Sequence, residues 1–548
     1  MDKFSFLNSA HTSFFAEMYD QYLESPDSLE PSWKAFFQGF DFGLESANIT
    51  LEEKKFEVPE NIKQEFKVVN LINAYRQRGH LFTITNPVRE RRKYSPTLDI
   101  ENFGLKESDL ELVFSAGEIV GIGPSKLKAI INKLKKIYCE SIGLEYMYIR
   151  DPLKVRWIQN FINVNSNQPN FSKNEKLSIL DSLNKAYTFE NFLQKKYVGQ
   201  KRFSLEGGEA LIPAIDFLIN SAAEKGVEEF IMGMSHRGRL STLANIFGKS
   251  SRDIFGEFEG KDYEEDIFDG DVKYHLGWTS ERTSSSGKKI NMNLAPNPSH
   301  LESVDPIVQG IARAKLENDF DNDTNKVLPI IVHGDAAVAG QGVVYEVIQM
   351  SRLKGYSTGG TIHLIVNNQV GFTTNYLDAR SSTYCSDVGK VTLSPVLHVN
   401  SDDVEAVIHA VTFALEYRDK FNRDVFIDLL GYRKYGHNEG DEPRFTQPRL
   451  YKFISGHPNP RDIYASKLMD QGLINDDHVS KIESKYFSKL ENELTDSKKK
   501  EKTKITPFMQ EVWDGFKRVD ENEMLEDYST SSSKQDVLNV AKSITSLP

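Results

Sequence analysis

Two short polar motifs follow apolar runs in the middle of the chain, and their side chains suit metal and phosphate chemistry. The run VLPIIVH leads into Gly334-Asp335, and the run TIHLIV ends on Asn367-Asn368. Each run resembles a buried parallel strand, so both motifs should reach the same edge of one sheet. Carboxylate, amide and carbonyl oxygens suit Mg²⁺ that is also held by a diphosphate. The pattern favours Mg²⁺ ligation by Asp335, Asn368 and the carbonyl of Val370, although a helix cap and an Asn-Asn turn would also explain it.

The stretch GDAAVAGQG, which starts at Gly334, is rich in small residues. Its glycines would let the backbone approach a phosphate closely, and Gly340 and Gly342 lie just before a helical pattern. A helix N-terminus favours anions. A tight connection between a strand and a helix explains the same stretch equally well.

Basic residues follow two further apolar runs. Ser235-His236-Arg237-Gly238-Arg239 comes after FIMGM, and His437 lies in a Tyr-Gly-His-Asn segment after VFIDLL. Histidine and arginine at a strand end can bind a diphosphate or a carboxylate substrate. The alternatives are a basic surface loop for the first segment and an ordinary loop histidine for the second.

Three other candidates have weaker patterns. His275 lies in DVKYHLGWTS, His300 lies in NPSHLE, and Thr279 follows His275 closely. A lone histidine is more often a structural residue than a catalyst, so spacing alone does not assign these residues a role.

The alternation of helical and strand patterns between residues 205 and 470 predicts an α/β fold with a doubly wound parallel sheet. The expected strands are 230–234, 327–332, 361–366 and 424–430, and the expected helices are 206–224, 341–354 and 402–420. The preceding region is mostly helical, with a break near Pro26 and Pro31 and a polar linker around residues 40–60. We therefore divide the chain into segments 1–45, 46–195, 196–470 and 471–548, the last containing a charged helix at 475–503.

Composition narrows the class of protein. The 548 residues include 67 Lys and Arg against 79 Asp and Glu, for a net charge of −12, which argues against a nucleic-acid partner. The segment GIGPSKLKAIINKL at 121–134 resembles a phosphate-contacting hairpin, but a helix start with a basic face explains it better. Cys139 and Cys385 are the only cysteines, so a reducing cytoplasm is expected. No secretory signal is visible, and no apolar run approaches the roughly 18 residues that would cross a membrane.

Several longer motifs resemble one enzyme family. GDAAVAGQG with VNNQVGFTT resembles the thiamine-diphosphate motif, with Ala336 where the general motif has glycine. The segments FSLEGGEALIP, SHRGRLSTLANI, GDVKYHLGWTS, NPSHLE, LDARSSTYCSDVGK and YRKYGHNEGDEPRFTQP resemble the decarboxylating subunit of 2-oxoglutarate dehydrogenase complexes. The resemblance is densest between about residues 200 and 455.

This resemblance implies cofactors and residue roles. The cofactors are thiamine diphosphate and Mg²⁺, with Asp335, Asn368 and Val370 as metal ligands. Arg237, Ala336 and His437 join these three residues in holding the cofactor. His236, His275 and Thr279 are the implied catalytic residues.

The resemblance also implies a reaction and its partners. The reaction is oxidative decarboxylation of 2-oxoglutarate in the tricarboxylic acid cycle, with succinyl transfer to a lipoyl-bearing succinyltransferase core. The N-terminal segment would dock on that core, and the complete enzyme would be a homodimer.

Family members continue for several hundred residues beyond the last residue of this chain. We therefore expect a pyrimidine-binding domain to be absent and the chain alone to be inactive, whether it is a fragment or half of a split enzyme. A non-catalytic assembly module that binds diphosphate and an enzyme specific for 2-oxoadipate remain alternatives.

Overall fold

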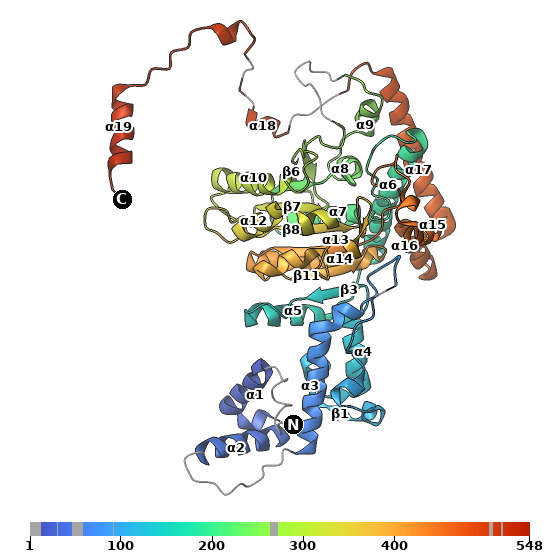
Figure 1. Cartoon of the computed structure of the whole chain (residues 1–548), viewed down its shortest axis with the longest axis vertical. Coiled ribbons are helices and arrows are strands. Elements are labelled where there is room, and N and C mark those ends of the chain that lie inside the picture. Colours follow the sequence, from blue (N-terminus) through green and yellow to red (C-terminus); the bar gives the residue numbers. More distant parts are fainter. Residues whose placement is uncertain are drawn as a thin grey trace. The chain divides into compact units, whose positions relative to one another are not determined.

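The computed structural model describes residues 12–29, 31–46, 59–90, 92–262, 272–503, 508–513, 515–516 and 519–547 (Figure 1). The chain forms two compact units, Met1–Phe508 and Met509–Pro548. The first unit contains the main sheet and the buried hydrophobic clusters. The second contains α18 (Gln510–Trp513), η8 (Glu523–Leu525) and α19 (Lys534–Thr545), none of which buries a described side chain.

Among the described residues, the main sheet has eight strands in the order β3-β11-β12-β8-β7-β4-β6-β5. The six inner strands are parallel, whereas β3 and β5 pair antiparallel at the two edges. The strand bounds are β3 (Ile142–Glu145), β4 (Glu229–Met234), β5 (Trp278–Thr283), β6 (Lys289–Leu294), β7 (Val327–Gly334), β8 (Ile362–Asn367), β11 (Val396–Asn400) and β12 (Val425–Leu430). The chain is therefore an α/β protein with a large, mostly parallel sheet, and the four strands expected from sequence are present.

The central strands are apolar without alternation because both faces of the sheet are covered. Every residue of β4 and β8 is buried, and only the last residue of β7 is partly exposed. Helix α10 packs on β4 and β7, and α14 packs on β11 and β12. The helices of this region are α7 (Leu211–Glu224), α8 (Arg239–Asn245), α9 (Ser251–Phe258), α10 (Val304–Asp319), α11 (Asp335–Gly340), α12 (Gly342–Met350), α13 (Tyr376–Ala379) and α14 (Val404–Phe421).

The N-terminal region is mostly helical, as predicted. A 3₁₀ turn, η1 (Pro26–Ser28), separates the first two helices at the proline-rich break. The helices are α1 (Thr12–Glu24), α2 (Pro31–Ser46), α3 (Glu60–Arg78), α4 (Leu127–Tyr138), α5 (Pro152–Val164) and α6 (Lys173–Lys196). The segment also contributes the edge strand β3 to the main sheet, a role that its short sequence IGLE does not reveal. Residues 47–58 of the expected linker, and residues before 12, lie outside the described residues.

Helix α4 explains the basic segment at 121–134. Leu127, Ile130 and Leu134 are fully buried on one side of this helix, which packs against α3 (Figure 1). The spacing of these residues marks a core-facing helix with a solvated basic side. The phosphate-contacting hairpin is therefore not what this segment forms.

In the first compact unit, three described α-helices follow the last strand. They are α15 (Pro448–Gly456), α16 (Pro460–Asp470) and α17 (Asp476–Lys499). The charged segment after residue 475 thus forms the expected helix, which starts where the Asn475 side chain accepts a hydrogen bond from the His478 amide at 3.0 Å. Within the described parts of the chain, none of the helices has both the length and the apolar character to cross a bilayer.

Candidate functional site

The carboxyl ends of four neighbouring parallel strands, β4, β7, β8 and β12, open onto one cavity of about 80 Å³. We call it the strand-end cavity. The carboxyl edge of a parallel sheet is where such folds bind ligands, because loops from several strands converge there. The predicted residues that line it are His236, Arg237, Asp335, Ala336, Asn368, Val370 and His437.

Asp335 and Asn368 meet in this cavity because β7 and β8 are adjacent and parallel. The backbone of Asn368 forms a hydrogen bond to the Asp335 carboxylate, and Asn368 Oδ1 accepts the Val370 amide at 3.3 Å. Burial raises the pKa of Asp335 to about 6, and the positive charge of Arg380 only partly opposes this rise. The charge of this buried carboxylate is only partly compensated by Arg380, so the residues fit a divalent metal ion.

The glycines around this motif have different roles. Gly334 lines the cavity, and a Cβ atom placed there would contact nothing, so the backbone leaves space on this side. Gly340 ends α11 and Gly342 begins α12, and neither lines the cavity. The expected helix at 341–354 is present as α12, whereas the short helix α11, which begins at Asp335, was not predicted.

Arg237 joins two of the strand-end loops. Its guanidinium donates to the Ser204 carbonyl at 2.9 Å and to the His437 carbonyl at 2.7 Å. Burial lowers the pKa of Arg237 to about 10, so the side chain keeps its charge at neutral pH beside the cavity. Arg239 is different, since it is fully buried and donates to backbone carbonyls, including those of Met234 and Ala295. The expectation of a ligand-binding role is therefore wrong for Arg239.

Two neutral imidazoles line the cavity. Burial and, secondarily, Arg237 lower the pKa of His236 to about 3 and that of His437 to about 4. The ring of Phe203 lies against both, with centroid distances of 4.0 Å to His236 and 5.6 Å to His437. At neutral pH each imidazole can therefore donate one hydrogen bond and accept another.

Three predicted candidates do not line this cavity. His275 is buried, with its ring beside that of Tyr274. Thr279 lies in β5, and its hydroxyl donates to Asn293 Oδ1 at 2.8 Å. His300 is exposed. The catalytic roles of His275 and Thr279 remain predictions.

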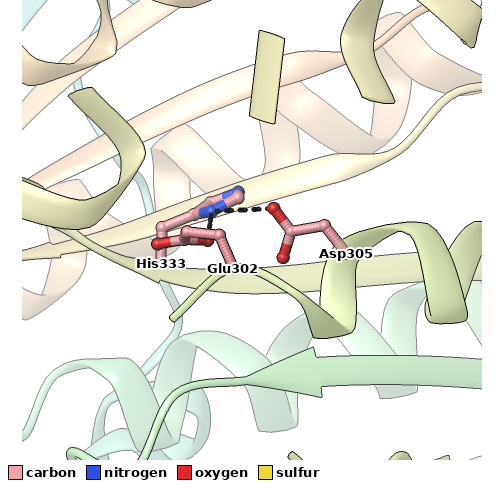
Figure 2. Close-up of side chains that lie close together, drawn as sticks. All are labelled: Glu302, Asp305 and His333. Atoms are coloured by element: carbon pink, nitrogen blue, oxygen red, sulfur yellow. Dashed lines mark hydrogen bonds and ion pairs between the residues drawn. The ribbon is translucent and has the colours of Figure 1, made fainter. Parts of the chain in front are cut away.

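A buried charged cluster, whose His333 also lines the cavity, was not predicted. Figure 2 shows the side chains of Glu302 and Asp305 pointing toward His333. His333 Nδ1 lies 2.6 Å from Glu302 Oε2 and 3.7 Å from Asp305 Oδ2. His333 Nε2 is also 2.9 Å from Nδ1 of His363. Burial raises the pKa of Asp305, and the neighbouring His333 only partly opposes this rise. The cluster links Glu302, just before α10, and Asp305, in the first turn of α10, to His333 near the end of β7.

The sequence held a signal for this cluster. His333 is an ionisable residue within a strand that is otherwise apolar, and such a residue needs a buried partner. The partners are in the segment that contains His300, which drew attention for its histidine instead. The other cavity residues that were not proposed from the sequence are Leu301, His333, Ala337, Val366, Gly371, Phe372 and Arg433.

The family model described as "Dehydrogenase E1 component" matches residues 182–506, which is more than half of the chain. The chain belongs to this family. A second model, "2-oxoglutarate dehydrogenase N-terminus", matches residues 4–44.

Several E1 relatives are similar along most of this chain. The 2-oxoglutarate dehydrogenase E1 component of Cupriavidus necator is 42% identical over 495 residues, which cover 86% of this chain and 52% of the relative. That of Haemophilus influenzae is 40% identical over 89% of this chain and 54% of its own length. The mitochondrial 2-oxoglutarate dehydrogenase of Dictyostelium discoideum is 38% identical over 94% and 53%. The chain thus spans about half the length of these relatives.

Proposed function

We propose that this E1 chain supplies the diphosphate- and Mg²⁺-binding part of a thiamine-diphosphate-dependent enzyme that oxidatively decarboxylates 2-oxoglutarate. The observation that carries the proposal is the meeting of Asp335, Asn368, Arg237 and His437 at one set of strand ends. The names of the similar proteins support the choice of 2-oxoglutarate. The same reasoning assigns the sheet to the doubly wound, thiamine-diphosphate-binding class.

In this proposal, the Asp335 carboxylate, the Asn368 amide oxygen and the Val370 carbonyl hold Mg²⁺. These are hard oxygen donors, and only Asp335 among them carries a charge. Arg237 and His437 would contact the diphosphate, with the backbone of Ala336 beside it. The loops after β4 and β12 are held together before the cofactor binds, because the Arg237 guanidinium donates a hydrogen bond to the His437 carbonyl.

Bound thiamine diphosphate supplies an electron sink for the carbanion that forms as carbon dioxide leaves. The protein must orient the substrate and stabilise charge that develops near the keto oxygen. Because His236 is neutral, its one imidazole N–H group can donate a hydrogen bond to that oxygen. We assign His275 and Thr279 to assisting roles in the same step.

The partner assignments belong to the same proposal. The lipoyl-bearing succinyltransferase core would accept the succinyl group, and the helices α1 and α2 would form the docking segment. The match of residues 4–44 to the N-terminus model supports this assignment. We also propose a homodimer and a cytoplasmic location, and 2-oxoadipate remains the alternative substrate.

Titration of the purified chain with thiamine diphosphate, with and without Mg²⁺, tests the site. We expect saturable binding that requires the metal ion. Binding that is independent of Mg²⁺, or its absence in the folded chain, would contradict the proposal. Comparing 2-oxoglutarate with 2-oxoadipate in the active enzyme would then decide the substrate.

A further inference from the structure

A second cavity, of about 310 Å³, lies next to the strand ends of the proposed cofactor site. Its walls come from described residues between 83 and 90, from Arg92 and Tyr94, from a segment between residues 367 and 384, and from Leu430. Asn367 and Gln369, the two neighbours of Asn368, both line it. We call it the arginine cavity, because Arg89, Arg92 and Arg380 face it from the two walls.

The three guanidinium groups of this cavity gather around one aromatic ring. Their central carbons lie 5.2 Å (Arg89), 5.2 Å (Arg92) and 5.4 Å (Arg380) from the centroid of the Tyr376 ring. The ring stabilises each cation modestly, but the three positive charges repel one another. Glu90, which is exposed, is the one carboxylate among the residues that line the cavity.

Several donors in this group lack a protein partner. Nε and Nη2 of Arg89 and Nε of Arg380 are buried and form no hydrogen bond with any residue that the structure describes. A partly buried guanidinium charge without a protein acceptor is costly, so an anion in the adjoining cavity would compensate it. The planar guanidinium group matches the geometry of phosphate and carboxylate oxygens.

The cavity wall is fixed in place before any ligand arrives. Asn86 exchanges two side-chain hydrogen bonds with Gln369, at 2.8 and 3.0 Å, and its Oδ1 also accepts the Arg89 amide at 3.1 Å. Gln369 donates in addition to the Gly431 carbonyl at 2.9 Å. A binding surface that is already ordered loses little conformational entropy when a ligand binds.

A wider cavity of about 1250 Å³ continues the positive surface. It shares Arg89, Arg92 and Tyr376 with the arginine cavity and adds Arg449 and Lys452. The chain as a whole has a net charge of −12, so this basic concentration opposes the overall charge. Such a local field attracts anions toward the cavity.

We propose that the arginine cavity binds a small organic anion with at least two negative charges, either a phosphate monoester or a polycarboxylate. This cavity shares no lining residue with the strand-end cavity, although the charge of Arg380 also acts on Asp335, and the proposed reaction does not require an anion there. Two or more charges are needed because a single carboxylate would leave most of the guanidinium charge uncompensated. Both ligand classes present the oxygen atoms that the unpartnered arginine donors require.

Calorimetric titration of the full chain at low ionic strength tests this site, with inorganic phosphate and citrate as the two probes. We expect saturable binding of at least one probe, and the tighter one identifies the ligand class. The double variant R89Q/R380Q should bind at least about tenfold more weakly, since it loses the charge-assisted donors. The matched control R150Q changes an exposed arginine outside both basic cavities and should bind normally.

Other outcomes would overturn the proposal. They are the failure of both probes to bind the wild-type chain, unchanged affinity in R89Q/R380Q, and an equal loss in R150Q. The single variant R92Q, at an exposed position, covers the case in which the double variant does not fold, and it should also weaken binding. R237Q separates the two cavities: we expect it to leave the tighter probe's affinity unchanged, whereas a loss would place the anion at the strand-end cavity.

Discussion

Asp335 is a residue where function and stability are expected to conflict. Burial raises the pKa of its carboxyl group to about 6, so the ionised form is held at a cost when no cation is present. A protein keeps such a group where a ligand compensates for it, which is the situation that Mg²⁺ would provide. The conflict leads to a prediction in which two measurements move in opposite directions.

We expect Asp335→Asn to weaken Mg²⁺-dependent binding of thiamine diphosphate by at least about 100-fold, because it removes the only anionic metal ligand. The melting temperature without cofactor should stay the same or rise, because a neutral amide costs less to bury. Calorimetric titration and thermal unfolding measure the two effects. Asp476→Asn, at an exposed position of α17, is the control. Unchanged cofactor affinity in the folded variant would show that Asp335 is not a ligand.

The histidines and Arg237 should differ in which step they affect. His236→Ala and His275→Ala, made in the active enzyme, should lower turnover about 10²- to 10³-fold while cofactor affinity changes little. Charge near the keto oxygen develops mainly in the transition state, so a donor to it affects rate. Arg237→Ala should lower cofactor affinity first. Assays of turnover and affinity test this, with the exposed His300→Ala as control. Histidine variants with normal turnover at saturating cofactor would contradict the assignment.

At the scale of elements, a buried charge network joins three strands of the sheet. His398 on β11 lies 2.9 Å from Asp428 on β12 and 2.9 Å from Glu145 on β3. Burial alone would lower the pKa of His398, but the two carboxylates outweigh it and raise the value to about 9. Asp428 also accepts a hydrogen bond from Asn367 at 2.8 Å, beside the proposed metal ligand.

This network predicts a pH dependence of stability. The folded pKa of His398 is above the unfolded value of 6.5, so its contribution is complete below about pH 6.5 and is lost as pH rises through 9. The contribution amounts to roughly 3 kcal/mol of unfolding free energy. Denaturant unfolding at pH 6.5 and pH 9 measures it. The difference between wild type and His398→Gln should be larger at pH 6.5, and an equal difference at both values would contradict the prediction.

The strands that could be predicted from the sequence are the central ones, which are buried on both faces and therefore continuously apolar. Strands β4, β7, β8 and β12 lie in the middle of the sheet, and runs such as VLPIIV reflect burial on both faces. The edge strand β5 has the sequence WTSERT, in which five of six residues are polar and none is fully buried, so its pattern resembles a loop. Strand β3 has four residues, which is too short for a periodic signal.

The same distinction holds for the site. Asp335 and Asn368 were predictable because a polar residue directly after a buried strand has a known location in a parallel sheet, and His437 lies in the loop that follows β12. The hydrogen bond between Glu302 and His333 depends on loops that bring distant segments together. The same is true of the cavity that Arg89 and Arg380 both line. Local pattern carries no information about such contacts.

At the scale of the whole molecule, the residues assigned to ligand binding and to the His398 network all lie in one of the two compact units. The unit Met1–Phe508 contains the strand-end cavity, the arginine cavity and the His398 network. In the unit Met509–Pro548, apolar side chains of α19, including Val537, Leu538 and Ile544, are exposed. A segment without a core of its own adds little to the free energy of unfolding.

We therefore expect a chain that ends at Phe508 to keep the stability and the cofactor site of the full chain. Its melting temperature should lie within about 2 °C of the full-length value, because removal of exposed residues changes little buried area. Its affinity for thiamine diphosphate and Mg²⁺ should stay within about twofold, since every residue assigned to that site lies before Phe508. Thermal unfolding and titration of both chains, side by side, measure these quantities. A drop of more than about 5 °C would show that residues 509–548 stabilise the protein despite their exposed side chains.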